Sequence, residues 1–188
     1  RQALQRLVDR GLLTRRRGVG TIVSPRQVHR PMELTSLMKD LVEAGHKVQT
    51  TIQRYEAHPA TEAEAEALKI EAGTLIVHIE RTRFTNNEPI AVLTNLIPAD
   101  IAPTMQELES GSLYDLMRER GVTLTSARQV IGARSATTKE AKLLSEHRGA
   151  ALLTTQRTTY DPSGRIVEYG DHIYRASRYS FEANLFAQ

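Results

Sequence analysis

The sequence predicts an α+β fold, in which an internally duplicated antiparallel-sheet domain follows a short basic segment. Residues 36–90 and 112–166 share many residue types at one constant spacing of 76. Alternating apolar runs separated by short turns predict antiparallel hairpins in both halves. The first 30 residues hold eight arginines against one acidic residue, a net charge of +7, whereas the remaining 17 basic and 21 acidic residues give the rest of the chain −4.

Residues 1–10 are predicted to form a short helix, because apolar side chains at positions 3, 4, 7 and 8 share one helical face and Gly11 can end it. A β-hairpin is predicted over residues 12–23, where Gly18 and Gly20 flank the tip and three consecutive arginines lie on the approach. This narrow cationic finger favours a polyanion as partner.

The order of these features resembles the end of the winged helix-turn-helix in GntR-family bacterial repressors, which reads as an R-x-A-L helix, a G-L-L strand and an R-G-x-G-T wing. The resemblance implies that Arg1 lies on the recognition helix and faces the major groove of DNA. Operator DNA is the implied partner. The residues implied to approach the minor groove at the wing tip are Gly18, Gly20 and Thr21.

The same resemblance implies that Arg15, Arg16 and Arg17 contact phosphates and so position the duplex rather than read its sequence. Residues 1–24 would then be the C-terminal part of the DNA-binding domain. We expect the two helices that normally precede this part to be absent from the chain, and binding by this fragment to be weak.

Residues 25–31 are predicted to be a linker, because Pro25 and Pro31 frame charged residues with little apolar content. Residues 32–188 would form the second domain. The chain has no cysteine and no long apolar run, so we expect a cytoplasmic protein without disulfides or membrane contact. We expect no cofactor.

Each repeat is predicted to begin with a helix that opens at Ser36 or Ser112 and stops at Gly45 or Gly121. Strands are predicted next, over residues 48–57 and 124–133. A second helix then begins in each unit at a Thr with a Glu three residues later, which is the pattern of a capping box. The four residues concerned are Thr61, Glu64, Thr137 and Glu140.

Each repeat is predicted to end in a hairpin, with first strands over residues 75–84 and 152–160. The turns are predicted at residues 86–87 and 162–164. Two such units related by a pseudo-twofold axis would leave a cleft between them.

This arrangement resembles the UTRA effector domain of HutC-type GntR regulators, whose fold is like that of chorismate lyase. The matching motifs are ERTRF at 80–84, EPIA at 88–91, GSLY at 111–114, VEY at 167–169, IYR at 173–175 and RYSF at 178–181. The resemblance implies a domain that binds a small effector and forms a homodimer.

Arg81 and Arg83 are predicted to bind an anion, because residues two apart on a strand share a face and two guanidiniums suit a phosphate or carboxylate. Hydroxyls at helix starts favour the same ligands, and they belong to Thr35, Ser36 and Ser112. By resemblance, the cleft would also be lined by Tyr114, Glu168 and Tyr174, with Glu168 accepting hydrogen bonds from the ligand.

We expect only the first unit to hold the anion, because Arg157 repeats Arg81 whereas Thr159 stands at the position that corresponds to Arg83. Leu93 stands near a position that is acidic in relatives that bind amino-sugar phosphates, which disfavours such a ligand. The six histidines show no metal-ligand spacing.

The sequence is therefore interpreted as a ligand-responsive transcriptional regulator, most simply a repressor, and not an enzyme. Two alternatives stay open. One is a lyase-type enzyme of the related fold, for which a wing would have no use. The other is a ligand sensor that does not bind DNA.

Overall fold

The computed structural model describes residues 13–16, 20–23, 28–31, 34–35, 37–43 and 45–182. In its N-terminal part the elements are β1 (Leu13–Arg16), β2 (Gly20–Val23), β3 (Val28–Pro31), α2 (Leu37–Glu43), β4 (Val48–Pro59), α3 (Glu62–Leu68), β5 (Leu75–Thr85) and β6 (Glu88–Pro98). The remainder contains α4 (Met105–Ser110), α5 (Leu113–Glu119), β7 (Ser126–Ser135), α6 (Thr138–Leu143), β8 (Ala151–Tyr160), β9 (Ile166–Arg175) and β10 (Tyr179–Glu182).

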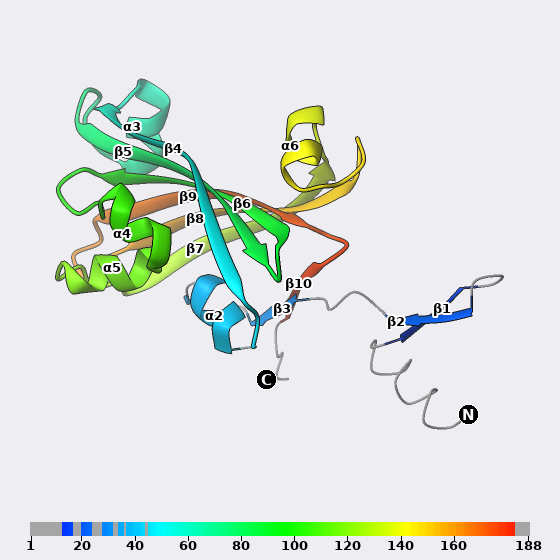
Figure 1. Cartoon of the computed structure of the whole chain (residues 1–188). Coiled ribbons are helices and arrows are strands. Elements are labelled where there is room, and N and C mark those ends of the chain that lie inside the picture. The colour runs from blue at the N-terminus through cyan, green and yellow to red at the C-terminus, as the bar shows by residue number, and fades with distance from the viewer. Residues whose placement is uncertain are drawn as a thin grey trace, which may run out of the picture.

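The main structure is a six-stranded antiparallel sheet with the strand order β4-β5-β6-β9-β8-β7 (Figure 1). Each half of the sheet is a three-stranded unit of consecutive strands, and the two units meet where β6 pairs with β9. The predicted α+β class and internal duplication are therefore confirmed.

The duplication extends to the backbone conformation of the turns. Gly45 and Gly121, which are 76 residues apart, have φ values of 79° and 80°, and each follows the helix that opens its unit. Positive φ is sterically allowed for glycine, so both helices can stop at the same place. Both predicted capping boxes are present at the starts of α3 and α6.

The spacing changes from 76 to 77 in the last strand. The first hairpin turns through Asn86 and Asn87, which both have positive φ, whereas the loop between β8 and β9 has one more residue. As a result Arg81 lies opposite Leu93, but its repeat Arg157 lies opposite Gly170. Ile90 and Ile166 therefore match in the sequence repeat, but the strand register displaces them from each other by one residue.

The helices cover both faces of the sheet. On one face, α3 and α6 pack through small apolar clusters around Leu68 and Leu144, and each cluster includes a residue of the other unit. On the other face lie α4 and α5, in the largest cluster, and α2, in a cluster with Tyr174. This second face is the one that carries the candidate site.

Two small sheets complete the fold. Strands β1 and β2 form the predicted antiparallel hairpin, which stands apart from the main sheet in Figure 1. Strand β3 pairs in parallel with β10 near the end of the chain. The segment predicted as a linker thus contributes a strand, because β10 offers backbone hydrogen-bonding groups that local sequence cannot reveal.

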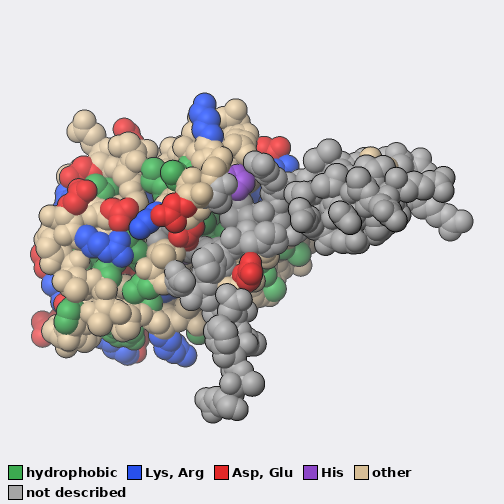
Figure 2. All heavy atoms as spheres, turned by 90° about the horizontal axis from the view of Figure 1, so that it is seen from below, with side chains coloured by type: hydrophobic (Ala, Val, Ile, Leu, Met, Phe, Trp, Pro, Cys, Tyr) green, Lys and Arg blue, Asp and Glu red, His purple; other side chains and the backbone are tan. Residues whose placement is uncertain are grey.

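The outer surface carries charges of both signs. Figure 2 shows acidic and basic side chains interspersed over the described part of one face. None of the described helices is long and apolar enough to cross a membrane.

We predict that the fold loses stability in acid partly because of the capping boxes that begin α3 and α6. Burial, the largest single effect, raises the pKa of Glu64, but hydrogen bonds from Thr61 and His58 outweigh it and lower the pKa to about 2. The pKa of Glu140 is also about 2, chiefly because Arg134 donates to its carboxylate. Stability from such groups is present above their unfolded pKa of about 4.5 and is lost as the pH falls toward 2.

Chemical denaturation of a Glu64→Gln, Glu140→Gln double variant at several pH values tests this. The variant should be less stable than the parent at pH 7 and should lose less stability between pH 5 and 2.5. Glu62→Gln, at an exposed position of α3, is the matched control and should follow the parent. An unchanged acid dependence in the double variant would show that other carboxylates are responsible.

Candidate functional site

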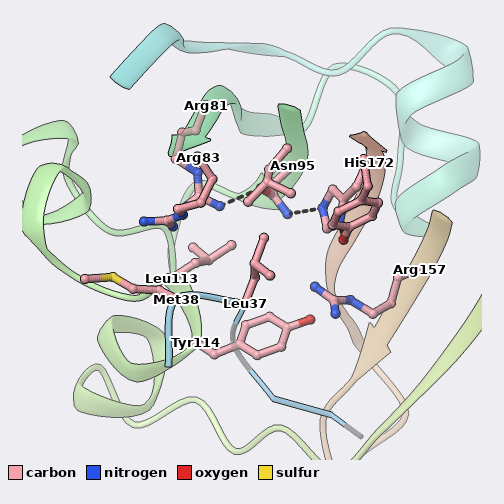
Figure 3. Close-up of a pocket in the computed structure, with 11 residues that line it drawn as sticks. Leu37, Met38, Arg81, Arg83, Asn95, Leu113, Tyr114, Arg157 and His172 are labelled. Carbon is pink, nitrogen blue, oxygen red and sulfur yellow. Dashed lines mark hydrogen bonds between the residues drawn. The ribbon is translucent and has the colours of Figure 1, made fainter. Parts of the chain in front are cut away.

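A small cavity of about 30 Å³ lies on the second face of the sheet, where α2 and α5 approach the junction of the two units (Figure 3). It is lined by Leu37, Met38, Arg81, Arg83, Leu93, Asn95, Leu113, Tyr114, Arg157, His172 and Tyr174.

The residues that line the cavity are related in pairs by the internal duplication. Leu37 and Met38 of α2 correspond to Leu113 and Tyr114 of α5, and Arg81 corresponds to Arg157. With the extra residue in the second hairpin, Asn95 corresponds to His172. These two side chains meet across the junction, with 3.2 Å between Asn95 Nδ2 and His172 Nε2. The cavity therefore lies on the pseudo-twofold axis.

Three buried guanidiniums dominate the electrostatics of the cavity. Arg81 and Arg83 are 2% exposed and Arg157 is 8% exposed. Arg81 donates through Nη2 to Asn95 Oδ1 at 2.8 Å, and Arg83 donates to the hydroxyl of Thr50. In Figure 3 the first two approach from β5 and Arg157 from the opposite wall.

The surroundings disfavour the charged form of the two β5 arginines. Burial lowers the pKa of Arg81 to about 10, with Glu168 opposing this shift and Arg157 adding to it. Burial likewise lowers the pKa of Arg83 to about 9, and the neighbouring charge of Arg81 lowers it further. Both groups remain cations near neutral pH, but at a cost in free energy that an anion would relieve.

Glu168 is the internal counter-ion of these arginines. Its side chain is fully buried, and its Oε1 accepts a hydrogen bond from Asn95 Nδ2 at 2.6 Å. Its Oε2 accepts from Thr159 at 2.7 Å and from Tyr114 at 3.1 Å, and lies 3.8 Å from Arg157 Nε. Both carboxylate oxygens are therefore occupied by the protein.

Gly170 makes room for this arrangement. A Cβ atom at Gly170 would lie 2.6 Å from both Glu168 Oε1 and His172 Nε2, so any side chain here would displace the counter-ion or the imidazole. The residue is thus constrained by a close approach of side chains rather than by its backbone angles.

The positive charge of the cavity exceeds the negative charge. Among the described residues that line it or bond to its lining, three arginines face one carboxylate, Glu168. Arg81 Nε and Nη1 and Arg83 Nε are buried and have no hydrogen-bond partner within the described part of the chain. An anion in the cavity would satisfy these donors and compensate the charge.

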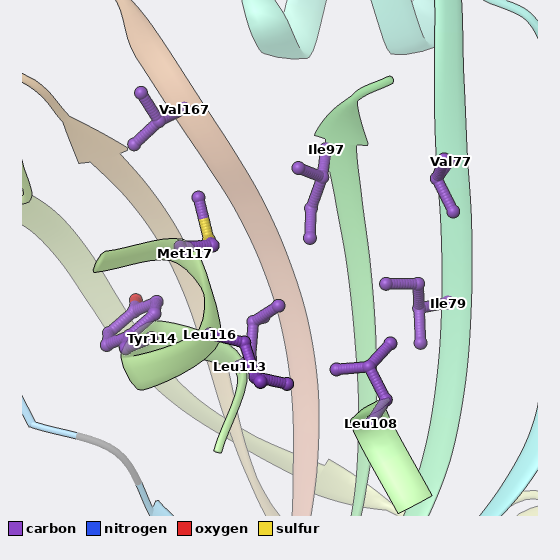
Figure 4. Packing of buried hydrophobic residues seen from close by; sticks show 9 residues of the cluster. All are labelled: Val77, Ile79, Ile97, Leu108, Leu113, Tyr114, Leu116, Met117 and Val167. Atoms are coloured by element: carbon purple, nitrogen blue, oxygen red, sulfur yellow. The ribbon is translucent and has the colours of Figure 1, made fainter. Parts of the chain in front are cut away.

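Tyr114 links α5 to this network. Its ring lies 4.9 Å from the Arg157 guanidinium, and burial raises the pKa of its hydroxyl, which therefore stays protonated and donates to Glu168. The helix itself is held by the apolar cluster around Met117 and Leu108 (Figure 4). Leu113 and Tyr114 of α5 thus belong both to the cavity lining and to this cluster.

The structure brings four of the predicted effector residues to the cavity, namely Arg81, Arg83, Tyr114 and Tyr174. Glu168 lies beneath the lining, bonded to protein groups, instead of facing a ligand. Ser112 precedes α5 without making a side-chain capping bond, and Thr35 donates to Asp40 at 2.8 Å. Ser36 lies outside the described residues.

Of the predicted DNA-contacting residues, Arg15 and Arg16 lie on β1, and Gly20 and Thr21 lie on β2. Arg1, Arg17 and Gly18 lie outside the described residues.

Sequence reasoning missed Asn95, His172 and Arg157 as lining residues. We expected only the first unit to hold an anion, but Arg157 of the second unit lines the cavity together with Arg81. Each of these residues could have been found from the sequence. Asn95 lies two positions from Leu93, and His172 lies two positions from Tyr174, on the same face of the same strand. Arg157 is the repeat of Arg81. Within the described chain, no group of acidic and histidine side chains is placed to hold a metal ion.

Comparison with known proteins agrees with this architecture. Residues 43–180 match the UTRA domain family. The chain is 34% identical to the HTH-type transcriptional repressor NagR of Bacillus subtilis over 184 residues, which cover 96% of this chain and 76% of NagR.

Two solved structures are also similar. The crystal structure of PhnF from Mycobacterium smegmatis is 25% identical, with a TM-score of 0.88, over 100% of this chain and 84% of PhnF. A putative transcriptional regulator from Streptomyces coelicolor is 47% identical, with a TM-score of 0.69, over 76% of this chain and 96% of that regulator.

We predict that Arg83→Met stabilises the protein in buffer that lacks phosphate and carboxylates. The substitution replaces a buried, incompletely hydrogen-bonded cation by an apolar side chain of similar length, so the free energy of unfolding should rise by about 1–3 kcal/mol. Urea denaturation measures this change.

Arg134→Met is the control, because Arg134 is half exposed and bonds both oxygens of Glu140. That variant should lose stability. If Arg83→Met were the more destabilising of the two, the positive charge of the cavity would not be in excess.

Proposed function

The chain belongs to the HutC group of GntR-family transcriptional regulators, whose effector module is the UTRA domain, and from this membership we propose that it represses transcription under the control of a small anionic metabolite. Its relatives are named as repressors, so the chain is a regulator rather than an enzyme of the related lyase type.

The proposal of an anionic ligand rests on the excess positive charge inside the cavity. Three guanidiniums and one already bonded carboxylate leave buried donors that only a ligand with several anionic oxygens can satisfy together. A phosphate or a carboxylate has this geometry. The interspersed charges on the outer face in Figure 2 offer no comparable concentration.

The size of the cavity limits the rest of the ligand. Its volume of about 30 Å³ has room for one anionic group, so a larger ligand must displace side chains that line the cavity. Leu37, Met38 and Leu93 supply apolar walls, while Asn95 and His172 offer polar groups. A sugar phosphate or a small carboxylate suits these walls, with its charged end at Arg81 and Arg83.

Two routes connect the cavity to the DNA-binding end of the chain. Helix α2 contributes Leu37 and Met38 to the lining and lies shortly after β3. Tyr174 of the lining stacks on Tyr179 of β10, with ring centroids 4.2 Å apart, and β10 pairs with β3. We propose that a bound effector shifts these contacts and thereby moves the segment that leads to the wing.

Operator binding is assigned to a cytoplasmic homodimer in which each copy presents one wing. The β1–β2 hairpin supplies Arg15 and Arg16 to DNA phosphates and Gly20 and Thr21 near the wing tip. Arg1, Arg17 and Gly18 complete this proposed interface. A change of linker position would alter the spacing of the two wings, so that they no longer fit both half-sites.

We predict that inorganic phosphate and phosphorylated sugars raise the melting temperature of the chain through the cavity arginines. A ligand at 100 times its Kd stabilises by about 2.7 kcal/mol. Arg81→Met should abolish the shift, whereas Arg118→Met, on an exposed part of α5, should keep it. A shift that persists in Arg81→Met would place the anion elsewhere, and no shift with any phosphate or carboxylate would overturn the proposed ligand class.

We predict that Arg15→Ala and Arg16→Ala each weaken operator binding in a protein that contains the whole winged helix-turn-helix. Each lost phosphate contact should reduce the slope of log affinity against log salt by about 0.9, for both specific and non-specific DNA. Fluorescence anisotropy at several salt concentrations measures this slope. Equal slopes in parent and variants would remove the wing from the interface, and no DNA binding by the parent would favour a ligand sensor.

A further inference from the structure

The two edges of the main sheet are duplicates of each other but are protected differently. On β4, a register irregularity between Ile52 and Arg54 interrupts the ladder, and Arg54, Glu56 and His58 follow it. A bulge and charged side chains are the usual means by which proteins keep an edge strand from pairing with another chain. Helix α4 also packs on β4.

Strand β7 has no register irregularity along its described length. Its ten residues pair with β8 in a continuous register, and its only charged side chains are Arg128 and Arg134. Most of its residues are exposed, including Val130 at 46% and Ile131 at 37%. Two large apolar side chains, one on each face, thus lie next to unpaired backbone groups at the edge.

The duplication shows what is missing at β7. Tyr55 of β4 and Ile131 of β7 are 76 residues apart and lie opposite Ile79 and Thr155, which are also 76 apart. Tyr55 packs against the main cluster, and its hydroxyl donates to the backbone oxygen of Pro103 just before α4. The corresponding residues before α2 include β3, which pairs with β10 instead, so Ile131 stays uncovered.

We propose that β7 is the dimer interface and pairs antiparallel with β7 of a second copy of this chain, with Val130 opposite Val130. The two sheets then form one continuous sheet about a twofold axis normal to its surface. This inference rests on the homodimer of the proposed function and identifies its contact surface.

The arrangement of charges is compatible with a second copy of β7 in this register. A twofold axis normal to the sheet keeps each residue on its own face, so residues that oppose each other must both be even or both be odd. With Val130 on the axis, Arg128 faces Gly132 and Arg134 faces Ser126, so no two arginines are opposed. Ala127 then faces Ala133, and Gln129 faces Ile131.

The adjacent register is unfavourable. A shift of one pair puts Ile131 on the axis and sets Arg128 directly opposite Arg134, where like charges repel. Of the two registers that place a large exposed apolar residue on the axis, only the one with Val130 avoids opposed arginines. An interface of this kind is isologous, which is the symmetry that a palindromic operator requires.

Light scattering and sedimentation of the whole chain test the surface. Val130→Lys should convert the dimer to a monomer at micromolar concentration, with at least a tenfold rise in the dimer dissociation constant. Met105→Lys is the matched control, because Met105 is also 46% exposed but lies on α4. A Val130→Lys protein that stays as dimeric as the control would overturn the proposal.

Single-cysteine variants test the register, since the chain contains no cysteine of its own. Directly opposed residues in antiparallel strands have Cα atoms about 4.5–5.5 Å apart, within the range of a disulfide. Val130→Cys should cross-link the dimer under mild oxidation, and Ile131→Cys should not. Cross-linking by Ile131→Cys alone would overturn the register, and cross-linking by neither would overturn the edge pairing.

The outcomes separate this inference from the proposed function. If Val130→Lys stays dimeric while phosphates still raise its melting temperature, only the surface is wrong. If the parent chain is monomeric at all concentrations, the homodimer and its surface both fail, whereas the anion site stands on its own thermal-shift result.

Discussion

The structure depends on one electrostatic constraint, which is the burial of three guanidiniums around a single carboxylate. Glu168 is fully buried and accepts hydrogen bonds from Asn95, Thr159 and Tyr114. These donors come from β6, β8 and α5, so the counter-ion ties both halves of the sheet and the covering helix together. The remaining positive charge is the basis for the proposed anionic ligand.

The internal duplication explains how such a centre arises at the junction of the units. A pseudo-twofold axis places equivalent side chains face to face, which gives Arg81 with Arg157 and Asn95 with His172. Function then requires departures from symmetry. Arg83 has Thr159 as its repeat, and that threonine bonds the counter-ion instead of adding a fourth cation. Leu93 corresponds in space to Gly170, which leaves room for Glu168.

The same loss of symmetry shapes the outside of the domain. The segment that should cover β7 pairs with the C-terminal strand instead, and this pairing joins the aromatic stack of Tyr174 and Tyr179 to the approach to the wing. One rearrangement therefore leaves a bare edge for a second copy and creates a route from the cavity toward the DNA-binding end. In the proposed function, ligand binding, dimerisation and DNA binding thus involve neighbouring elements.

The sequence by itself determined the fold class, the repeat, the capping boxes, the hairpin turns and the pairing of Arg81 with Arg83, because each depends on residues close together in the chain or on a constant spacing. Only the tertiary structure decided that Arg157 joins those arginines, that Glu168 serves as counter-ion, and that β3 is a strand. These depend on which strands become neighbours and on a one-residue difference in a loop. Local propensity and periodicity carry no information about contacts between β6 and β9, which lie more than 70 residues apart.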